Sequence, residues 1–528
     1  MLVSFILVTV LLCASSSLYP RIFMGVKATN GFPVHNLDTG LNYATIQDAI
    51  NADETLNGHT ILVDAGTYYE NVVVNKSVAL VGEDRSNTIV DGNFTGKVFT
   101  VASNSVNITG FTVRNHGKEW WDSGIFVQGS KTCNITGNKI ITDVDDFLPM
   151  KESSMKVQVM AIPPPETYGI LLTSASGSYI KDNEIIDHIN ASYGVGTYGI
   201  GLPMDSNNNF LIGNKILESD FGIYLDWRSS NNEISGNKIA TARIFGIALV
   251  NDNNNNSLTD NYVAYAYRGI VVYASGGSKL FNNTVINNKN GIWLEYGGGH
   301  LLVENNVVNN KEYGIDIRQT GNNIIYHNNF INNTPQVSFF ELYSNAWDCA
   351  YPSGGNYWSD YNGTDLFSGS YQNETGSDGI GDKPYDIDGI DSNQDNYPLM
   401  GTFSDFNATS EYYVQTISNS TISNSRFNGT AIYFNVTGEN GTSGFCRICV
   451  PKELMDQPYH VFVNGTEIQH TLLPCSNGTH SYLCFNYTHS TEEVIIIPEF
   501  PSFLVLPIFM IATLLAVIAF RRKQADRR

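Results

Sequence analysis

The sequence predicts an all-β fold, a right-handed parallel β-helix, and two repeating patterns carry this prediction. A glycine followed by isoleucine and a second aliphatic residue recurs eight times, at Gly124, Gly169, Gly199, Gly222, Gly246, Gly269, Gly291 and Gly314. From Gly199 onward the repeats are roughly 22 to 24 residues apart, a spacing typical of solenoids. The aliphatic residues stand one and three positions after the glycine, which is the pattern of a strand with one buried face.

An asparagine marks a second position in each repeat, where it precedes a pair made of any residue and an aliphatic one. These residues are Asn138, Asn183, Asn214, Asn237, Asn261, Asn283, Asn306 and Asn329. Asparagine tolerates the left-handed backbone of a turn, and copies stacked on successive coils can join into a ladder of side chains. We therefore expect about thirteen coils that turn at these asparagines, each adding about 4.8 Å to a rod.

The solenoid is expected to span residues 18–345, with a cap at each end because terminal coils cannot leave their apolar faces open. Residues 43–50 have the pattern of a short amphipathic capping helix, and residues 346–401 form an acidic, Gly-rich C-terminal cap. Residues 402–498 alternate Thr, Val, Tyr and Phe with Gly turns. This last pattern predicts a small antiparallel β-sandwich.

The sandwich segment holds four cysteines, Cys446, Cys449, Cys475 and Cys484. In an exported protein two disulfides are the expected arrangement for them. A zinc site made by all four is the alternative, and the nine-residue spacing of the second pair disfavours it.

Both ends of the chain indicate export to the cell surface. Residues 1–17 hold an apolar run followed by serines, which is typical of a signal peptide. Residues 499–528 contain the apolar stretch Phe503–Phe520 followed by Arg and Lys, so we expect a transmembrane helix with a cytoplasmic basic tail. Eighteen Asn-X-Ser/Thr sequons agree with a glycosylated surface, or follow by chance from a composition rich in these residues.

The net charge of −21 argues against nucleic acid as a partner, because phosphate binding requires a basic surface. The same charge disfavours a polyuronate unless metal ions bridge the like charges.

Positions two and four after each glycine are expected to point outward and to form rows along one face of the rod. These rows and the residues that follow them place aromatic rings beside carboxylates: Phe126, Tyr224, Asp226, Trp227, Tyr273, Trp293 and Tyr296. Rings offer flat apolar area and polar neighbours bond hydroxyl groups, so this face predicts glycan binding. The alternative is that the rings only stack between coils and stiffen the rod.

Catalysis on a polysaccharide would require paired carboxylates. One candidate group is Asp143, Asp145 and Asp146, in an insertion between repeats, where an acidic turn or a calcium loop is the favoured alternative. The other is Glu295 with Asp316, which the coil rise separates by about 8 Å, although Arg318 is expected to pair with Glu295. The sequence therefore favours a protein that is not an enzyme.

Two metals are considered. Asp378, Asp382, Asp386, Asp388 and Asp391 gather hard oxygen ligands in a Gly-rich segment, which predicts calcium or, alternatively, solvated acidic turns. Copper is disfavoured, because the one group of soft ligands is Met150, Met155 and Met160, whose spacing puts successive side chains on opposite faces of a strand.

Several segments resemble known families. Residues 60–68 and 77–90 look like the first coils of pectinesterases and NosD-type proteins, and residues 42–400 resemble the NosD-like β-helix family of carbohydrate-binding and sugar-hydrolase proteins. Some members of that family assist copper loading of nitrous oxide reductase. Residues 497–502 resemble the PEF-type sorting tails of archaeal surface proteins, in which an archaeosortase removes the span and leaves a lipid-linked protein.

Together these patterns predict an exported, membrane-anchored cell-surface protein that recognises glycans or surface-layer components, or that gives the envelope structure. A polysaccharide-active hydrolase or lyase is the first alternative, and a copper-binding accessory protein of the NosD type is the second.

Overall fold

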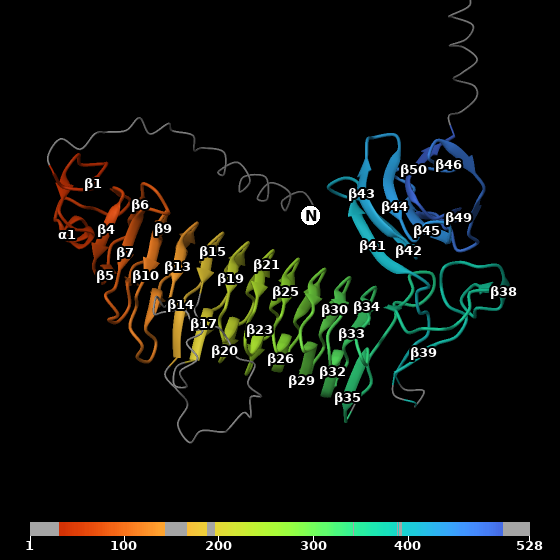
Figure 1. The fold of residues 1–528 in the computed structure, drawn as a ribbon, viewed down its shortest axis with the longest axis horizontal. Helices are drawn as coiled ribbons and strands as arrows, with labels where there is room; N and C mark the ends of the chain where they lie inside the picture. The colour runs from red at the N-terminus through yellow and green to blue at the C-terminus, as the bar shows by residue number, and fades with distance from the viewer. Residues whose placement is uncertain are drawn as a thin grey trace, which may run out of the picture.

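The computed structural model describes residues 31–142, 166–186, 196–341, 343–387, 389 and 393–499. Over these residues the chain forms a parallel β-helical rod that continues into a loop-rich cap and an antiparallel module (Figure 1). The expected signal peptide and the expected span Phe503–Phe520 lie outside the described residues. Within the described ranges, no helix has the length and apolar character that crossing a membrane requires.

Three long sheets form the walls of the rod. The 13-stranded sheet runs in the order β2 (Asn42–Tyr43), β1 (Val34–Asn36), β3 (Thr60–Val63), β6 (Ala79–Gly82), β9 (Asn107–Thr109), β12 (Asn134–Thr136), β15 (Tyr179–Lys181), β18 (Phe210–Ile212), β21 (Glu233–Ser235), β24 (Ser257–Thr259), β27 (Lys279–Phe281), β30 (Leu301–Val303) and β33 (Ile324–Tyr326). The 12-stranded sheet runs in the order β36 (Tyr357–Trp358), β34 (Asn329–Ile331), β31 (Asn306–Val308), β28 (Thr284–Ile286), β25 (Tyr262–Ala264), β22 (Lys238–Ala240), β19 (Lys215–Leu217), β16 (Glu184–Ile186), β13 (Lys139–Ile141), β10 (Thr112–Arg114), β7 (Thr88–Asp91) and β4 (Gly66–Tyr69). The 11-stranded sheet runs in the order β35 (Val337–Phe340), β32 (Tyr313–Gly321), β29 (Asn290–Gly298), β26 (Arg268–Gly276), β23 (Phe245–Val250), β20 (Phe221–Asp226), β17 (Gly196–Pro203), β14 (Glu166–Thr173), β11 (Ser123–Gln128), β8 (Phe99–Val101) and β5 (Val72–Val74).

Each coil contributes one strand to each sheet and buries aliphatic side chains between them. In the coil of β20, β21 and β22 these are Ile223, Ile234 and Ile239, all fully buried. Burial of one such side chain stabilises the fold by about 1.5–3 kcal/mol. The predicted parallel β-helix is confirmed. Its 11-stranded sheet counts fewer coils than the expected thirteen or so, because some coils are longer than 23 residues, such as the steps of 45 residues from Asn138 to Asn183 and of 31 residues from Asn183 to Asn214.

The repeated glycines are required by the close approach of successive coils. A Cβ on Gly222 would lie 2.5 Å from the carbonyl oxygen of Gly246 and 2.5 Å from Cγ2 of Ile239. Real Cβ atoms do not come so close to backbone, so any larger residue here would push two coils apart.

A buried ladder of asparagines runs along the rod, as the sequence predicts. In a typical rung, Asn237 Nδ2 donates to Leu211 O (2.8 Å) and to Asn261 Oδ1 (3.0 Å). The last coils correct the expected register, because Asn305 and Asn328 make the rungs rather than Asn306 and Asn329. The full ladder is Asn138, Asn183, Asn214, Asn237, Asn261, Asn283, Asn305, Asn328 and Asn356.

The ladder ends at Asp395, whose Oδ2 accepts from Asn356 N (2.7 Å) and from Trp358 Nε1 (2.9 Å). A carboxylate suits this end of the ladder, because the last rung requires an acceptor. An asparagine here would also present N–H donors, and no further coil is present to accept from them.

The rod is capped at both ends. At the N-terminal end α1 (Ile46–Asn51) buries Ile46 and Ile50 against the first coils, and Thr45 Oγ1 caps it by accepting from Asp48 N (2.9 Å). At the other end the cap contains two short antiparallel pairs. These are β37 (Phe367–Ser368) with β38 (Glu374–Thr375) and β39 (Tyr385–Asp386) with β40 (Gln394–Asp395).

The C-terminal module consists of two five-stranded antiparallel sheets. One is β41 (Thr402–Asn407), β42 (Tyr413–Ser418), β45 (Ser443–Pro451), β49 (His480–Thr488) and β48 (His470–Leu472). The other is β43 (Thr421–Phe427), β44 (Ile432–Thr437), β50 (Thr491–Pro498), β46 (Tyr459–Val463) and β47 (Thr466–Ile468). Ile448 and Phe485 of the first sheet and Phe434 and Ile496 of the second share one buried cluster, so the two sheets form a sandwich.

The sandwich docks on the last coils of the rod through β41 (Figure 1). Asn329 of β34 exchanges two hydrogen bonds with the backbone of Phe403, at 2.8 and 2.9 Å, and the Phe403 ring stacks on His327 at 3.9 Å. Beside these contacts the carboxyl groups of Glu304 and Asp405 share a hydrogen bond.

The four sandwich cysteines are free thiols in the structure, and the two disulfides expected from the sequence stay a prediction. Strand alternation separates the two whose strands are paired: Cys446 is buried in the sandwich core and lies opposite Phe485, whereas Cys484 lies opposite Arg447, one position out of phase. Cys449 and Cys484 lie toward the other face of the same sheet, where burial raises the pKa of each thiol to about 11.

Candidate functional site

The outer face of the 11-stranded sheet carries most of the residues that the sequence assigns to glycan binding. Phe126 is one of them, but it is only 4% exposed, because it belongs to an apolar cluster with Tyr168, Leu171 and Tyr198. Tyr224 packs against the same cluster. The expected contact of Phe126 with a ligand is therefore corrected to a packing role.

The residue immediately before each repeated glycine also points outward, and the sequence reasoning missed this third row. Tyr198, Phe221 and Phe245 occupy it on successive coils and pair in register, with ring centroids 4.4 and 5.4 Å apart. The strand bends at the glycine, so the glycine and the following isoleucine are both buried and the alternation slips by one residue. An aromatic residue directly before glycine was the signal available in the sequence.

Arg268 continues this row and forms the centre of the face. Its guanidinium carbon lies 2.9 Å from the centroid of the Trp293 ring, and that of Arg318 lies 5.5 Å from the same ring. A cation over an indole ring contributes about 0.5–2 kcal/mol. Trp293 is consequently not an open stacking platform, because Arg268 covers one face of its ring.

The two predicted carboxylates, Glu295 and Asp316, meet at this centre on adjacent strands. Glu295 is the register partner of Arg318, as expected, but the ion pair joins Arg318 Nε to Asp316 Oδ2 at 2.8 Å. Arg318 and Asp316 stand two residues apart on one strand and point to the same side, which decides this partner. Burial raises the pKa of Glu295 above its usual range, even though Arg318 and Arg268 oppose the shift.

We call Arg268, Trp293, Glu295, Asp316 and Arg318 the Trp293 cluster. Among the described residues, three of its buried polar atoms have no hydrogen-bond partner: Arg268 Nε, Trp293 Nε1 and Asp316 Oδ1. Asp316 is only 1% exposed, and burial lowers the pKa of Arg268 to about 10. Each unpaired buried polar group costs about 1–3 kcal/mol, so a rearrangement that brought these atoms into contact with a donor and acceptor would be favourable.

The remaining predicted rings lie at or near the ends of the strands. Trp227 and Tyr296 are 58% and 43% exposed. Each directly follows an outward-pointing carboxylate, Asp226 at the end of β20 and Glu295 in β29. Tyr273 supports Tyr296 through an edge contact at 5.5 Å. Asp226 accepts from Asn251 Nδ2 (2.9 Å) and from Trp227 N (2.8 Å), so its carboxylate helps to shape the turn.

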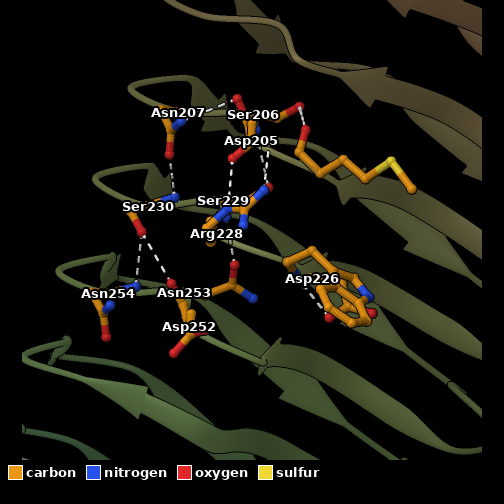
Figure 2. A network of polar contacts seen from close by, with 12 residues as sticks. Asp205, Ser206, Asn207, Asp226, Arg228, Ser229, Ser230, Asp252, Asn253 and Asn254 are labelled. Carbon is orange, nitrogen blue, oxygen red and sulfur yellow. Dashed lines mark hydrogen bonds and ion pairs between the residues drawn. The ribbon is translucent and has the colours of Figure 1, made fainter.

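A polar network joins the turns that follow these strand ends (Figure 2). Arg228 donates twice to Asp205, at 2.9 and 3.1 Å. Asn254 N donates to Ser230 Oγ (2.9 Å) and Ser230 N donates to Asn207 Oδ1 (2.6 Å). The network holds the turns of three successive coils in line beside the outer face.

The predicted calcium ligands serve the cap in another way. Asp382 accepts from the backbone N–H groups of Leu366 and Phe367, at 2.9–3.1 Å, and Asp386 accepts from Gly389 N at 2.8 Å. Asp378 accepts from Ile380 N (3.1 Å), and burial raises the pKa of its carboxyl to about 6. The other two calcium candidates, Asp388 and Asp391, lie outside the described residues. So do the catalytic candidates Asp143, Asp145 and Asp146 and the methionines Met150, Met155 and Met160. Over the part of the chain that the structure describes, no three His, Cys, Asp or Glu side chains are arranged to hold a metal ion.

Comparison with known proteins adds a family, a relative and several similar structures. The family described as periplasmic copper-binding protein (NosD) matches residues 46–226, 162–268 and 196–363, which together span more than half of the chain. A cell surface glycoprotein of Methanothermus fervidus is 35% identical over 108 residues, which cover 20% of this chain and 17% of that relative.

Two similar solved structures are β-helix enzymes. The periplasmic alginate epimerase AlgG has a TM-score of 0.33 and 15% identity, over 55% of this chain and 84% of that one. The catalytic domain of GH87 α-1,3-glucanase has a TM-score of 0.36 and 10% identity, over 56% of this chain and 64% of that one. At these identities and TM-scores we draw no conclusion from the likeness.

Proposed function

The chain belongs to the NosD family, and from this premise we propose that it is an exported cell-surface protein whose 11-stranded sheet recognises glycans or surface-layer components. The relative named as a cell surface glycoprotein supports the location. The sequons and the apolar segments at both ends of the sequence fit the same location. Anchoring through Phe503–Phe520, with or without processing at the PEF-like segment, is part of this proposal.

The observation that carries the proposal is the Trp293 cluster, in which Arg268, Trp293, Glu295 and Arg318 are part-exposed and three polar atoms beneath this surface have no partner. Arg268 Nε and Trp293 Nε1 are donors, and Asp316 Oδ1 is an acceptor. A hydroxyl group both donates and accepts, whereas a carboxylate would be repelled by Asp316 and an ammonium group by Arg268. A sugar carries several hydroxyl groups on one rigid ring, which suits two donors and one acceptor held on a rigid sheet.

Copper does not enter this proposal, although the description of the family names it. The Trp293 cluster has no thiol, thioether or imidazole, and copper sites use those ligands. We therefore assign no copper chemistry to these residues.

The test is a glycan array and titration calorimetry on the full chain, together with an assay for new reducing ends. Trp293→Ala should weaken binding at least tenfold, because it removes one donor and the support of Arg268. The matched control is Tyr179→Ala, which removes a 42% exposed ring from the 13-stranded sheet instead. Equal affinities of the two variants, or no glycan bound by the wild-type chain, would refute the proposal.

A polysaccharide-active enzyme is the second candidate, and the presence of two carboxylates, Glu295 and Asp316, on the outward face of adjacent strands favours it. The raised pKa of Glu295 is a property of a general acid, and Asp316 adds to that shift. New reducing ends that disappear in Glu295→Gln would establish this candidate in place of a binding protein.

A further inference from the structure

A depression of about 490 Å³ lies beside the outer face of the 11-stranded sheet, at the ends of β23, β26, β29 and β32. It is distinct from the Trp293 cluster, since none of the five cluster residues lines it. The lining comes from four successive coils, so the depression is elongated along the axis of the rod.

Unusually long strands build this depression. β26, β29 and β32 each have nine residues, whereas β20 and β23 have six. In β29 the backbone turns at Tyr296, with a φ of 48°, and the strand then continues through Gly297 and Gly298, which pair with the neighbouring strands on both sides. The sheet thus bends and extends as a shelf beyond the outer face.

The floor of the shelf is backbone because glycine is required there. Gly297 and Gly298 have φ values of 130° and 141°, a conformation that other residues rarely adopt. A Cβ on Gly297 or Gly298 would overlap the carbonyl oxygen of Ser275 or Gly321. A bare floor of this kind lets a ligand approach peptide groups closely.

The walls of the depression are polar but carry little charge. Asp252 and Asn254 form one end, and Asn322 forms the other. Figure 2 shows Asp252 and Asn254 on the turn after β23, where Asn254 Oδ1 accepts from Gly276 N at 2.7 Å. Among the described residues that line the depression there is no Lys, Arg or His, and Asp252 is the one acid. An anionic polymer would find no cation here, whereas hydroxyl groups would find donors and acceptors.

An aromatic ring borders the shelf. Tyr296 directly precedes Gly297, is 43% exposed, and is held by the edge of Tyr273. A ring beside a polar, backbone-lined trough is the combination that binds the apolar face of a sugar together with its hydroxyl groups.

We propose that this depression seats a neutral glycan chain, which lies along the rod axis across four coils with Tyr296 against one of its sugar rings. The class of ligand rests on the glycan recognition proposed above, whereas the place and the neutral charge come from the depression itself. The glycan would contact four coils spaced about 4.8 Å apart, so the affinity of the protein for it should increase with glycan length over the first few sugar units.

The experiment compares cello-oligosaccharides, mannan oligosaccharides and oligogalacturonates of increasing length on the full chain by titration calorimetry. Gly276→Ala adds a methyl group to the shelf with little strain, because its Cβ would stand 3.4 Å from both Asn254 Oδ1 and Gly298 O. Asn254→Ala removes a polar wall from an exposed turn and serves as a second variant if the first does not fold.

We expect a neutral series to bind with length-dependent affinity, and both variants to weaken it at least tenfold. Neutral sugars that bind wild type and both variants equally, yet fail on Trp293→Ala, would overturn the depression as the seat and leave the proposed function in place. Preference for oligogalacturonates would overturn the assignment of a neutral ligand. A wild-type chain that binds no sugar would overturn both proposals.

Discussion

Substitution of a single rung of the asparagine ladder tests the account of the rod most directly. The side chain of Asn305 is fully buried, and its Nδ2 donates to Leu280 O at 2.8 Å and to Asn328 Oδ1 at 2.8 Å. Its Oδ1 accepts from the backbone N–H of Asn283 at 3.0 Å. The next residue, Asn306, belongs to β31 and lies outside the ladder.

The magnitude follows from the groups that each substitution leaves without a partner. Asn305→Ala removes the side-chain partners of Asn283 N–H and Leu280 C=O, both of them buried. At about 1–3 kcal/mol for each group, the free energy of unfolding should fall by about 4 kcal/mol. Asn306→Ala removes one acceptor from Asn329 Nδ2, which still donates to Phe403 O at 2.9 Å, so the loss should stay near 1 kcal/mol or below.

The assay is thermal unfolding followed by circular dichroism, combined with hydrogen exchange at single-residue resolution. Asn305→Ala should lower Tm by about 5 °C and speed exchange of the Asn283 amide, whereas Asn306→Ala should change neither by much. Equal losses in the two variants would refute the register of the ladder and the energetic role assigned to it.

Two further predictions concern the interface of the sandwich and the packing of coils. Burial and the neighbouring Asp405 carboxyl raise the pKa of Glu304 from 4.5 to about 8, so the folded state binds this proton more tightly than the unfolded chain does. The resulting stabilisation is full below a pH of about 4.5 and is lost as the pH rises through about 8. Glu304→Gln should therefore flatten the dependence of Tm on pH over this range. A Tm profile identical to that of wild type would contradict the proton held between Glu304 and Asp405. A Cβ on Gly246 would stand 2.6 Å from Gly269 O, so Gly246→Ala should cost about 1–3 kcal/mol in urea unfolding. The control is Gly66→Ala, where the nearest atom is 3.6 Å away, and an equal midpoint for the two variants would contradict the requirement for close approach.

The sequence by itself determined the fold of the rod. The aliphatic residues one and three positions after each glycine alternate with outward residues, and this alternation at a nearly constant spacing has one economical solution, a stack of coils. The asparagine ladder followed from the same spacing, because stacked copies of one residue fall into line. These features depend on local periodicity, which a single sequence displays in full.

Contacts between coils are a different matter, and the tertiary structure alone decided them. Where two asparagines are adjacent, as at Asn305 and Asn306, either one satisfies the pattern, and the register of the neighbouring coil selects the rung. Arg318 had two carboxylates within reach, and its pairing with Asp316 depends on how the side chains are arranged over the sheet.

In the candidate site, too, some residues were predicted from the sequence and others were revealed only by the tertiary structure. Trp293, Glu295 and Asp316 were predicted from their outward positions, whereas Arg268 was missed because the bend at Gly269 breaks the alternation. The long shelf next to Tyr296 was missed as well, since it requires three neighbouring strands to extend past the same bend. A sequence displays which residues a coil contains, but the bend of each strand and the stacking of one coil on the next decide which of them meet.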